Sequence, residues 1–148
     1  MKKKTVFVFL FLSLVFWGIG FVFINNHEFG LCYFNLNTNT FDVSCGYKYW
    51  NVGLPLFYSM PALAFTFLIL LFLPQAIPAW KKFAKWFIPL ATLLFIFYGD
   101  PGSGDLFAPY PEQIFRWVSI FYVIVSIVII LWITIKEKNN NNLDIELK

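Results

Sequence analysis

The chain has 148 residues, a length that allows one domain. Hydrophobic residues make up 59% and charged residues 13% of it, whereas an ordinary soluble domain has roughly 45–50% and 25%. This composition excludes a water-soluble globular protein, and the few, scattered cations behind the net charge of +3 exclude a nucleic-acid-binding face.

Four apolar runs without a charged residue follow one another along the chain: Thr5–Ile24, Leu54–Leu73, Trp86–Gly99 and Trp117–Ile135. A run of about 20 apolar residues matches the ~30 Å hydrocarbon core of a bilayer. We therefore predict an all-α membrane protein with a four-transmembrane-helix bundle over residues 1–138. Its spans are expected at about 5–24, 54–73, 80–98 and 115–135, followed by a disordered cytoplasmic tail over 139–148.

The first and third runs each leave an alternative open. A basic start and the small residues near Gly18 and Gly20 also fit a cleaved signal peptide, but the run is longer than the roughly 7–15 residues of a signal core. The third run is short unless its helix begins near Trp80. A helix that begins there is long enough, because lysines on one face can extend towards the membrane surface. The alternative is a re-entrant segment.

The distribution of lysine and arginine along the chain predicts its orientation in the membrane. Nine of the eleven cations lie in the N-terminal segment, the segment between the second and third runs, and the C-terminal tail. The two intervening loops hold only Lys48 and Arg116. The positive-inside rule therefore puts both termini in the cytoplasm. Because the chain lacks an Asn-x-Ser/Thr sequon, we expect a bacterial source and a multi-pass protein of the bacterial inner membrane.

Aromatic and basic residues at the ends of the runs are expected to anchor the bundle at the two membrane surfaces. The outer anchors are Trp50 and Trp117, and the inner ones are Trp80, Trp86, Trp132, Lys81, Lys82 and Lys85.

The loop between the first two runs carries both cysteines, in a Cys-x12-Cys spacing. A β-hairpin over 31–46 with its turn between Thr38 and Asn39 places Cys32 opposite Cys45 and Phe34 opposite Val43, on one apolar face. Opposed Cα atoms in such a pair are ~4.5–5.5 Å apart, which suits a disulfide. We predict a disulfide-stapled hairpin outside the membrane. A redox-active or metal-binding pair and two free thiols are the alternatives.

Polar residues inside the runs fall on shared helical faces. Ser59, Ala62 and Thr66 share one face of the second span, and Ser119, Tyr122 and Ser126 share one face of the fourth. Small and hydroxyl residues let membrane helices approach and hydrogen-bond, so these faces predict packing seams. A small-molecule pocket lined by Tyr58 and Tyr122 is the alternative. Pro55, Pro61 and Pro89 predict an irregular start or a kink in their helices.

No catalytic arrangement stands out. A serine nucleophile needs a base, and the single histidine, His27, lies beyond the membrane edge. Proton relays need acidic residues within the membrane, and the spans have none. We expect no enzyme activity, no cofactor and no metal site.

The layout resembles the claudin-type tetraspan plan: termini inside, a larger first outer loop with a cysteine pair, and a smaller second loop. The family's Trp…Gly-Leu-Trp…Cys…Cys signature is not reproduced, since Trp50 and Gly53-Leu54 follow the cysteines. The segment Lys82–Asp100, with its Trp-Phe-Ile-Pro-Leu core, is also similar to uncharacterised small four-span proteins of bacteria, a resemblance that implies no activity.

The expected function is an interaction or accessory role, through helix packing and the outer loops. The expected partners are the lipid bilayer and either another membrane protein or a second copy of the chain. The alternative is a facilitator or carrier of a neutral or lipidic small molecule.

Overall fold

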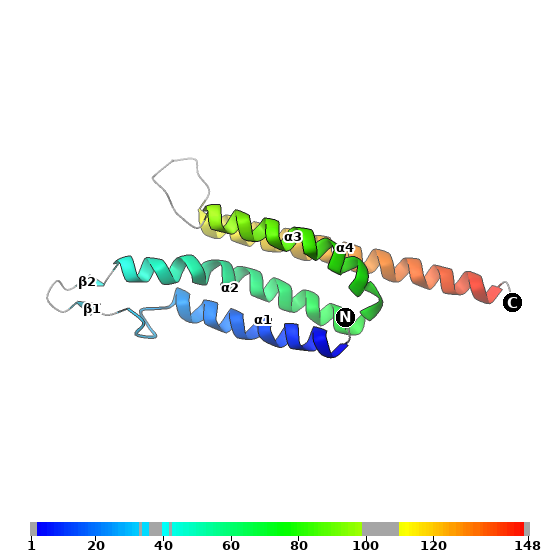
Figure 1. Ribbon diagram of the computed structural model, residues 1–148, viewed down its shortest axis with the longest axis horizontal. Coiled ribbons are helices and arrows are strands. Elements are labelled where there is room, and N and C mark those ends of the chain that lie inside the picture. The colour runs from blue at the N-terminus through cyan, green and yellow to red at the C-terminus, as the bar shows by residue number, and fades with distance from the viewer. Residues whose placement is uncertain (1–2, 33, 36–39, 42, 99–109, 147–148) are drawn as a thin grey trace.

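A computed structural model describes residues 3–32, 34–35, 40–41, 43–98 and 110–146. Four α-helices dominate this part of the chain (Figure 1). In chain order the elements are α1 (Lys3–Ile24), β1 (Phe34–Asn35), β2 (Thr40–Phe41), α2 (Val43–Phe72), the 3₁₀ turn η1 (Pro74–Ala76), α3 (Ile77–Tyr98) and α4 (Pro111–Glu146).

Three of these helices are long and apolar enough to cross a membrane: Lys3–Ile24, Ser44–Phe72 and Pro111–Glu137, with mean hydropathies of 2.6, 2.0 and 2.8. Large apolar side chains cover much of their outer surface, as expected where lipid replaces water. The protein is therefore associated with a membrane. The fourth helix, α3, has 22 residues and carries three lysines in its first half.

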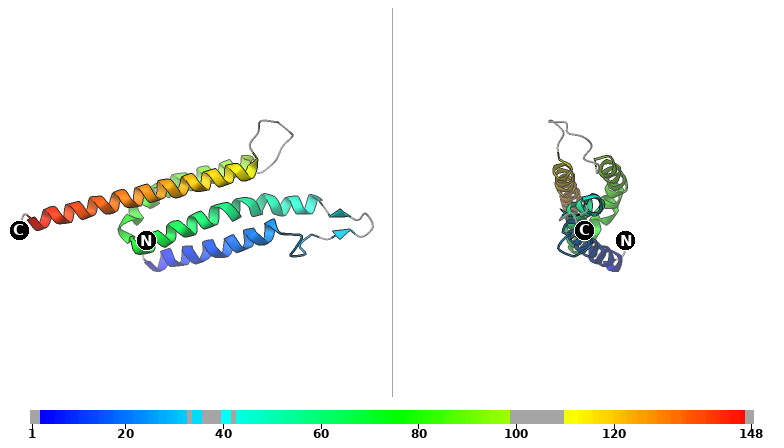
Figure 2. Two further views of the ribbon diagram at one scale, coloured as in Figure 1. Left: turned by 180° about the vertical axis from the view of Figure 1, so that it is seen from behind. Right: turned by 90° about the vertical axis from the view of Figure 1, so that its left-hand side faces the viewer.

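The helices run alternately in opposite directions and form two pairs (Figures 1 and 2). α1 packs along α2, and α3 packs along α4. α2 also packs against α4 and so joins the two pairs. The last turns of α4 extend beyond the end of the bundle at which η1 lies (Figure 1).

Local sequence explains the sharp turn between α2 and α3. Pro74 opens η1, where its missing N–H group costs nothing, and Pro78 lies in the first turn of α3. The backbone N–H of Ala76 donates to the carbonyl of Leu73 at 3.2 Å. This turn returns the chain directly into α3.

α2 continues through Pro55 and Pro61 without a break in the helix. The hydroxyl of Ser59 donates to the carbonyl of Pro55 at 2.6 Å, and Thr66 donates to Ala62 at 2.9 Å. Both are bonds to the residue one turn earlier in the same helix, and neither goes to the carbonyls of Asn51 or Phe57, whose usual i+4 donors Pro55 and Pro61 lack.

The best-buried core lies towards the η1 end of the bundle. It includes Leu70 on α2, Ala76 of η1, Trp80 of α3 and Ile130 of α4. The rings of Phe67 and Trp80 meet edge to face, with centroids 5.3 Å apart. These contacts fix α2, α3 and α4 to one another at this end.

The hairpin predicted over 31–46 is wrong. Val43, Ser44 and Cys45 form the first turn of α2, so Cys45 is helical. The described pairing is limited to two residues on each side, and Phe34 lies opposite Phe41 instead of Val43. The alternation that predicted a second strand also fits the first turn of a helix. A helix satisfies its backbone hydrogen bonds within the segment, which a membrane protein favours near the bilayer.

Two predicted helix boundaries also differ from the structure. α2 begins at Val43, well before the predicted start near 54, so Pro55 does not mark an irregular start. The tail predicted to be disordered from 139 instead continues α4 to Glu146. No glycine or proline lies between Trp117 and Glu146 to end the helix.

Candidate functional site

A compact turn follows α1 and brings the chain back to the start of α2. We call residues 25–32 together with 44–47 the outer cap, because the sequence predicts that they lie outside the membrane. The amide of Asn25 donates to the carbonyl of Phe21 at 2.9 Å, and the backbone N–H of Leu31 donates to the carbonyl of Asn26 at 2.9 Å. Gly30 has a φ of 66°, a conformation that glycine adopts without strain.

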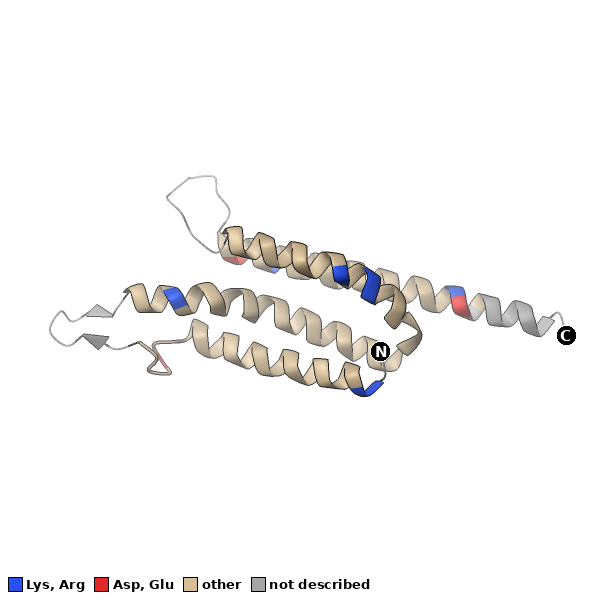
Figure 3. Cartoon of the chain, viewed as in Figure 1, with Lys and Arg blue, Asp and Glu red and all other residues tan. Residues whose placement is uncertain are grey.

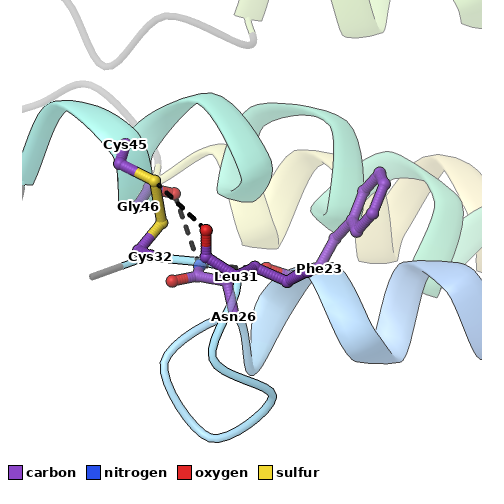
Figure 4. Close-up of a disulfide and its surroundings, with 6 residues drawn as sticks. All are labelled: Phe23, Asn26, Leu31, Cys32, Cys45 and Gly46. Atoms are coloured by element: carbon purple, nitrogen blue, oxygen red, sulfur yellow. Dashed lines mark hydrogen bonds between the residues drawn. A yellow bond between two sulfur atoms is a disulfide. The ribbon is translucent and has the colours of Figure 1, made fainter.

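A disulfide joins the two sides of the outer cap (Figure 4). It links Cys32, at the end of the turn, to Cys45 in the first turn of α2, with their Cα atoms 5.9 Å apart. The predicted disulfide is therefore confirmed, although it joins a turn to a helix and not two strands. Sγ of Cys45 lies 3.8 Å from the carbonyl oxygen of Leu31. Because a disulfide sulfur carries no proton, this is a packing contact.

Asn26 forms a second link across the outer cap (Figure 4). Its side chain is buried, and its amide Nδ2 donates to the carbonyl of Phe23 at 3.0 Å and to that of Gly46 at 3.5 Å. A Cβ atom at Gly46 would lie 3.3 Å from Nε2 of His27, so the absence of a side chain lets the two segments approach. The disulfide and Asn26 together hold the end of α1 against the start of α2.

The fixed outer cap presents aromatic and charged side chains to its surroundings. Phe29 is half exposed and meets Phe21 edge to face, with ring centroids 6.2 Å apart. Glu28 and Tyr47 are also exposed, and so is Lys48, the next residue along α2.

A second group of polar residues lies inside the bundle. Thr66 on α2, Trp80 on α3 and Ser126 on α4 surround the hydroxyl of Tyr122. None of them makes a hydrogen bond of standard geometry with it, and Ser119 also lacks a hydrogen-bond partner. All five side chains are buried. We call these five residues the polar seam.

A cavity of about 110 Å³ adjoins the polar seam between α2, α3 and α4. Ser59 and Ala62 line it from α2, Thr92 from α3, and Ser119 and Tyr122 from α4. The structure therefore brings together most of the polar residues singled out on the second and fourth spans. Tyr58 does not line this cavity and instead packs its ring on Phe57, with centroids 5.4 Å apart.

Most of the predicted anchors are exposed at the bundle surface. Trp50, Trp86, Trp117 and Trp132 are exposed, and so are Lys81, Lys82 and Lys85. Trp80 is the exception, because η1 turns its face of α3 towards Phe67 and buries it. Among the described residues, the lysines of α1 and α3 lie towards the η1 end (Figure 3), whereas Lys48 and Arg116 are near the starts of α2 and α4.

The close contact between α1 and α2 was not predicted from the sequence. A Cβ atom at Gly20 of α1 would lie 2.8 Å from the backbone nitrogen of Phe57, and one at Gly53 of α2 would lie 2.8 Å from Cβ of Phe23. The two glycines therefore mark the point at which the backbones of α1 and α2 approach most closely. A glycine near the end of the first run and another just before the second run are the signal that could have revealed it.

The described residues contain no group of three His, Cys, Asp or Glu side chains placed to hold a metal ion. No family model, curated protein or solved structure matches this chain at a significant level.

Proposed function

We propose that this protein is a small integral membrane protein that acts without catalysis, by binding another membrane protein through its outer cap and its helix faces. The observation that carries the proposal is the double linkage of the outer cap by the Cys32–Cys45 disulfide and by Asn26. A surface held in one conformation loses less entropy when a partner binds it. Phe29, exposed on this fixed surface, is the kind of aromatic residue that dominates protein interfaces.

We further propose four membrane crossings with both termini in the cytoplasm, in the bacterial inner membrane. α2 and α4 lie side by side and run in the same direction (Figures 1 and 2). If both cross the bilayer, the chain between them has to cross back, and α3 is the helix that makes this return. The lysines of α1 and α3 then share one surface, which the positive-inside rule assigns to the cytoplasm.

Photo-crosslinking in native membranes tests the interaction. A photoreactive amino acid at Phe29 is expected to give a discrete adduct with a second membrane protein or a second copy of the chain. The same probe at Leu90, an exposed apolar position on α3, reports contacts in the lipid-facing region and serves as the comparison.

The adduct at Phe29 is expected to weaken in the Cys32→Ser, Cys45→Ser double variant, because the outer cap is then held only by Asn26. If crosslinking at Phe29 and gentle purification both return only a monomer, the interaction proposal is wrong.

A second function is supported by the cavity beside the polar seam: a facilitator or carrier of a neutral or lipidic small molecule. Ser119 and Tyr122 line this cavity, and their hydroxyls are buried beside it without a hydrogen-bond partner, so a ligand that reached them would meet unpaired donors. Tyr122→Phe separates the two functions. It should abolish transport or ligand binding in a carrier, while the crosslink at Phe29 should remain in an interaction protein.

A further inference from the structure

A groove separates α1 from α3 along one side of the bundle. α1 packs along α2 and α3 packs along α4, so the chain leaves a space of about 560 Å³ between α1 and α3 with α2 as its floor. The end-on view of Figure 2 shows α1 and α3 on the same side of α2. Leu63 and Phe67 contribute to the floor, and Leu12 and Phe16 to the wall on α1.

The lining is almost wholly apolar along its length. Ser13 is the one hydroxyl residue in it, and its hydroxyl donates to the carbonyl of Leu10 at 2.7 Å. A polar ligand would therefore find little to bind within the groove, whereas a hydrocarbon chain would meet apolar surface on three sides.

One end of the groove is basic. Lys81 and Lys85 line it and lie one helical turn apart on α3, so their side chains extend from the same face. Lys82, between them in the sequence, does not line the groove. Lys81 is in the first turns of α3, beside the lysine-rich end of the bundle (Figure 3).

The dimensions of the groove match one leaflet of a bilayer. Its wall on α3 runs from Trp80 to Pro89, which is about 14 Å at ~1.5 Å per residue. Half of the ~30 Å hydrocarbon core is about 15 Å. The groove therefore reaches from the basic surface to about the middle of the membrane.

We propose that this groove binds an acyl chain of one anionic phospholipid, whose phosphate group lies between Lys81 and Lys85. The charge of the basic end selects an anionic headgroup, and the apolar walls accept the chain. A helix of a second copy is a poorer fit, because none of the acidic residues in the described part of α1–α4 lies within the apolar stretches: Glu112 is in the first turn of α4, and Glu137 and the acids after it follow the apolar run that ends at Ile135. This inference rests on the proposed crossing of α3, and does not depend on a partner for the outer cap.

Native mass spectrometry of the purified full chain tests the proposal. The protein is exchanged into detergent with equal amounts of phosphatidylglycerol and phosphatidylcholine of the same acyl chains, and the retained lipids are counted. The wild type should retain phosphatidylglycerol up to about 25-fold better, because each of the two lysines near an anionic headgroup contributes about fivefold. Lys81→Gln with Lys85→Gln should remove this preference, whereas Lys82→Gln should keep it.

Matched variants of α1 test the apolar part of the groove. Leu12→Trp fills the groove and should reduce retention of both lipids, whereas Leu14→Trp, at a similarly exposed position outside the lining, should not.

Circular dichroism and gel filtration identify any variant that fails to fold, and the folded Lys81→Arg, Lys85→Arg pair should keep the preference for phosphatidylglycerol. Equal retention of the two lipids by the wild type, or equal losses in the Lys82→Gln and double variants, would overturn the proposal. A dimer that forms in place of the lipid-bound monomer would overturn it as well.

Discussion

Single residues without side chains set the distance between α1 and α2. Gly20 and Gly53 face each other across this contact, and an added Cβ atom at either would come within 2.8 Å of the opposite helix. Lipid offers no hydrophobic driving force for association, so close packing carries much of the stability of helix pairs in membranes. The close approach also positions the outer cap, because both helices lead directly into it.

Gly20→Ala should destabilise the protein by about 1–3 kcal/mol, the usual cost of an extra methyl group in a packed contact. Denaturation titrations in mixed micelles measure this loss. Gly18→Ala is the matched control, since a Cβ atom there meets nothing within 4 Å and alanine favours the helix. Equal stabilities of the two variants would show that the α1–α2 contact is looser than described.

The disulfide acts at the same end of the molecule. Cys32 and Cys45 are 13 residues apart, and closing a loop of about this length stabilises a protein by about 3 kcal/mol in the chain-entropy model. Cys32→Ser with Cys45→Ser should therefore lower the unfolding free energy by up to about this amount. A reducing agent should destabilise the wild type similarly and leave the double variant unchanged. An effect of reductant on the double variant would contradict this assignment.

At the scale of elements, the positions of the four helices could be predicted because charge and turn residues mark where each apolar run ends. Pro74 marks the turn between the second and third helices in the sequence and in the structure, whereas Lys81 lies within the first turns of α3. The start of α2 could not be predicted, because the alternation of residues over Val43–Cys45 fits a strand or a helical turn equally well. Nor could the sequence show that Trp80 faces inward, since this depends on the angle at which η1 redirects α3.

The polar seam, too, could be predicted only in part from the sequence. Helical spacing alone grouped Ser119, Tyr122 and Ser126 on one face of α4, and the structure places this face beside α2. Spacing cannot tell which neighbouring helix supplies the opposite residues, so Trp80 of α3 was missed as a member of the polar seam. Tyr58 was included although its face of α2 turns away from the cavity.

The packing of α4 against α2 can be tested at Ser126, which is fully buried in the polar seam. Ser126→Leu should destabilise the bundle by about 1–3 kcal/mol through overpacking. Ser126→Ala should cost less than about 1 kcal/mol, because the serine hydroxyl has no hydrogen-bond partner to lose. Val128→Leu, an exposed position two residues along α4, should be close to neutral. The same unfolding assay measures all three, and a stable Ser126→Leu variant would mean that space remains beside α4.

At the scale of the whole molecule, the direction of α4 decides the topology. Three apolar helices would place the two termini on opposite sides of the membrane, whereas the return crossing through α3 places them on the same side. The two arrangements differ in the side on which the end of α4 emerges. Because both native cysteines are in the disulfide, one introduced cysteine is the single free thiol of the protein.

In the proposed four-crossing topology, a membrane-impermeant maleimide should label Phe29→Cys in intact cells, because the outer cap then faces outward and Phe29 is exposed. Lys136→Cys should react only after the cells are opened. Leu93→Cys, exposed near the middle of the second half of α3, should be protected under both conditions because lipid surrounds it. Labelling of Lys136→Cys in intact cells would mean that α3 does not cross. In that case α2 and α4 could not both span the bilayer in the same direction, and the arrangement of the two helix pairs described here would have to change in the membrane.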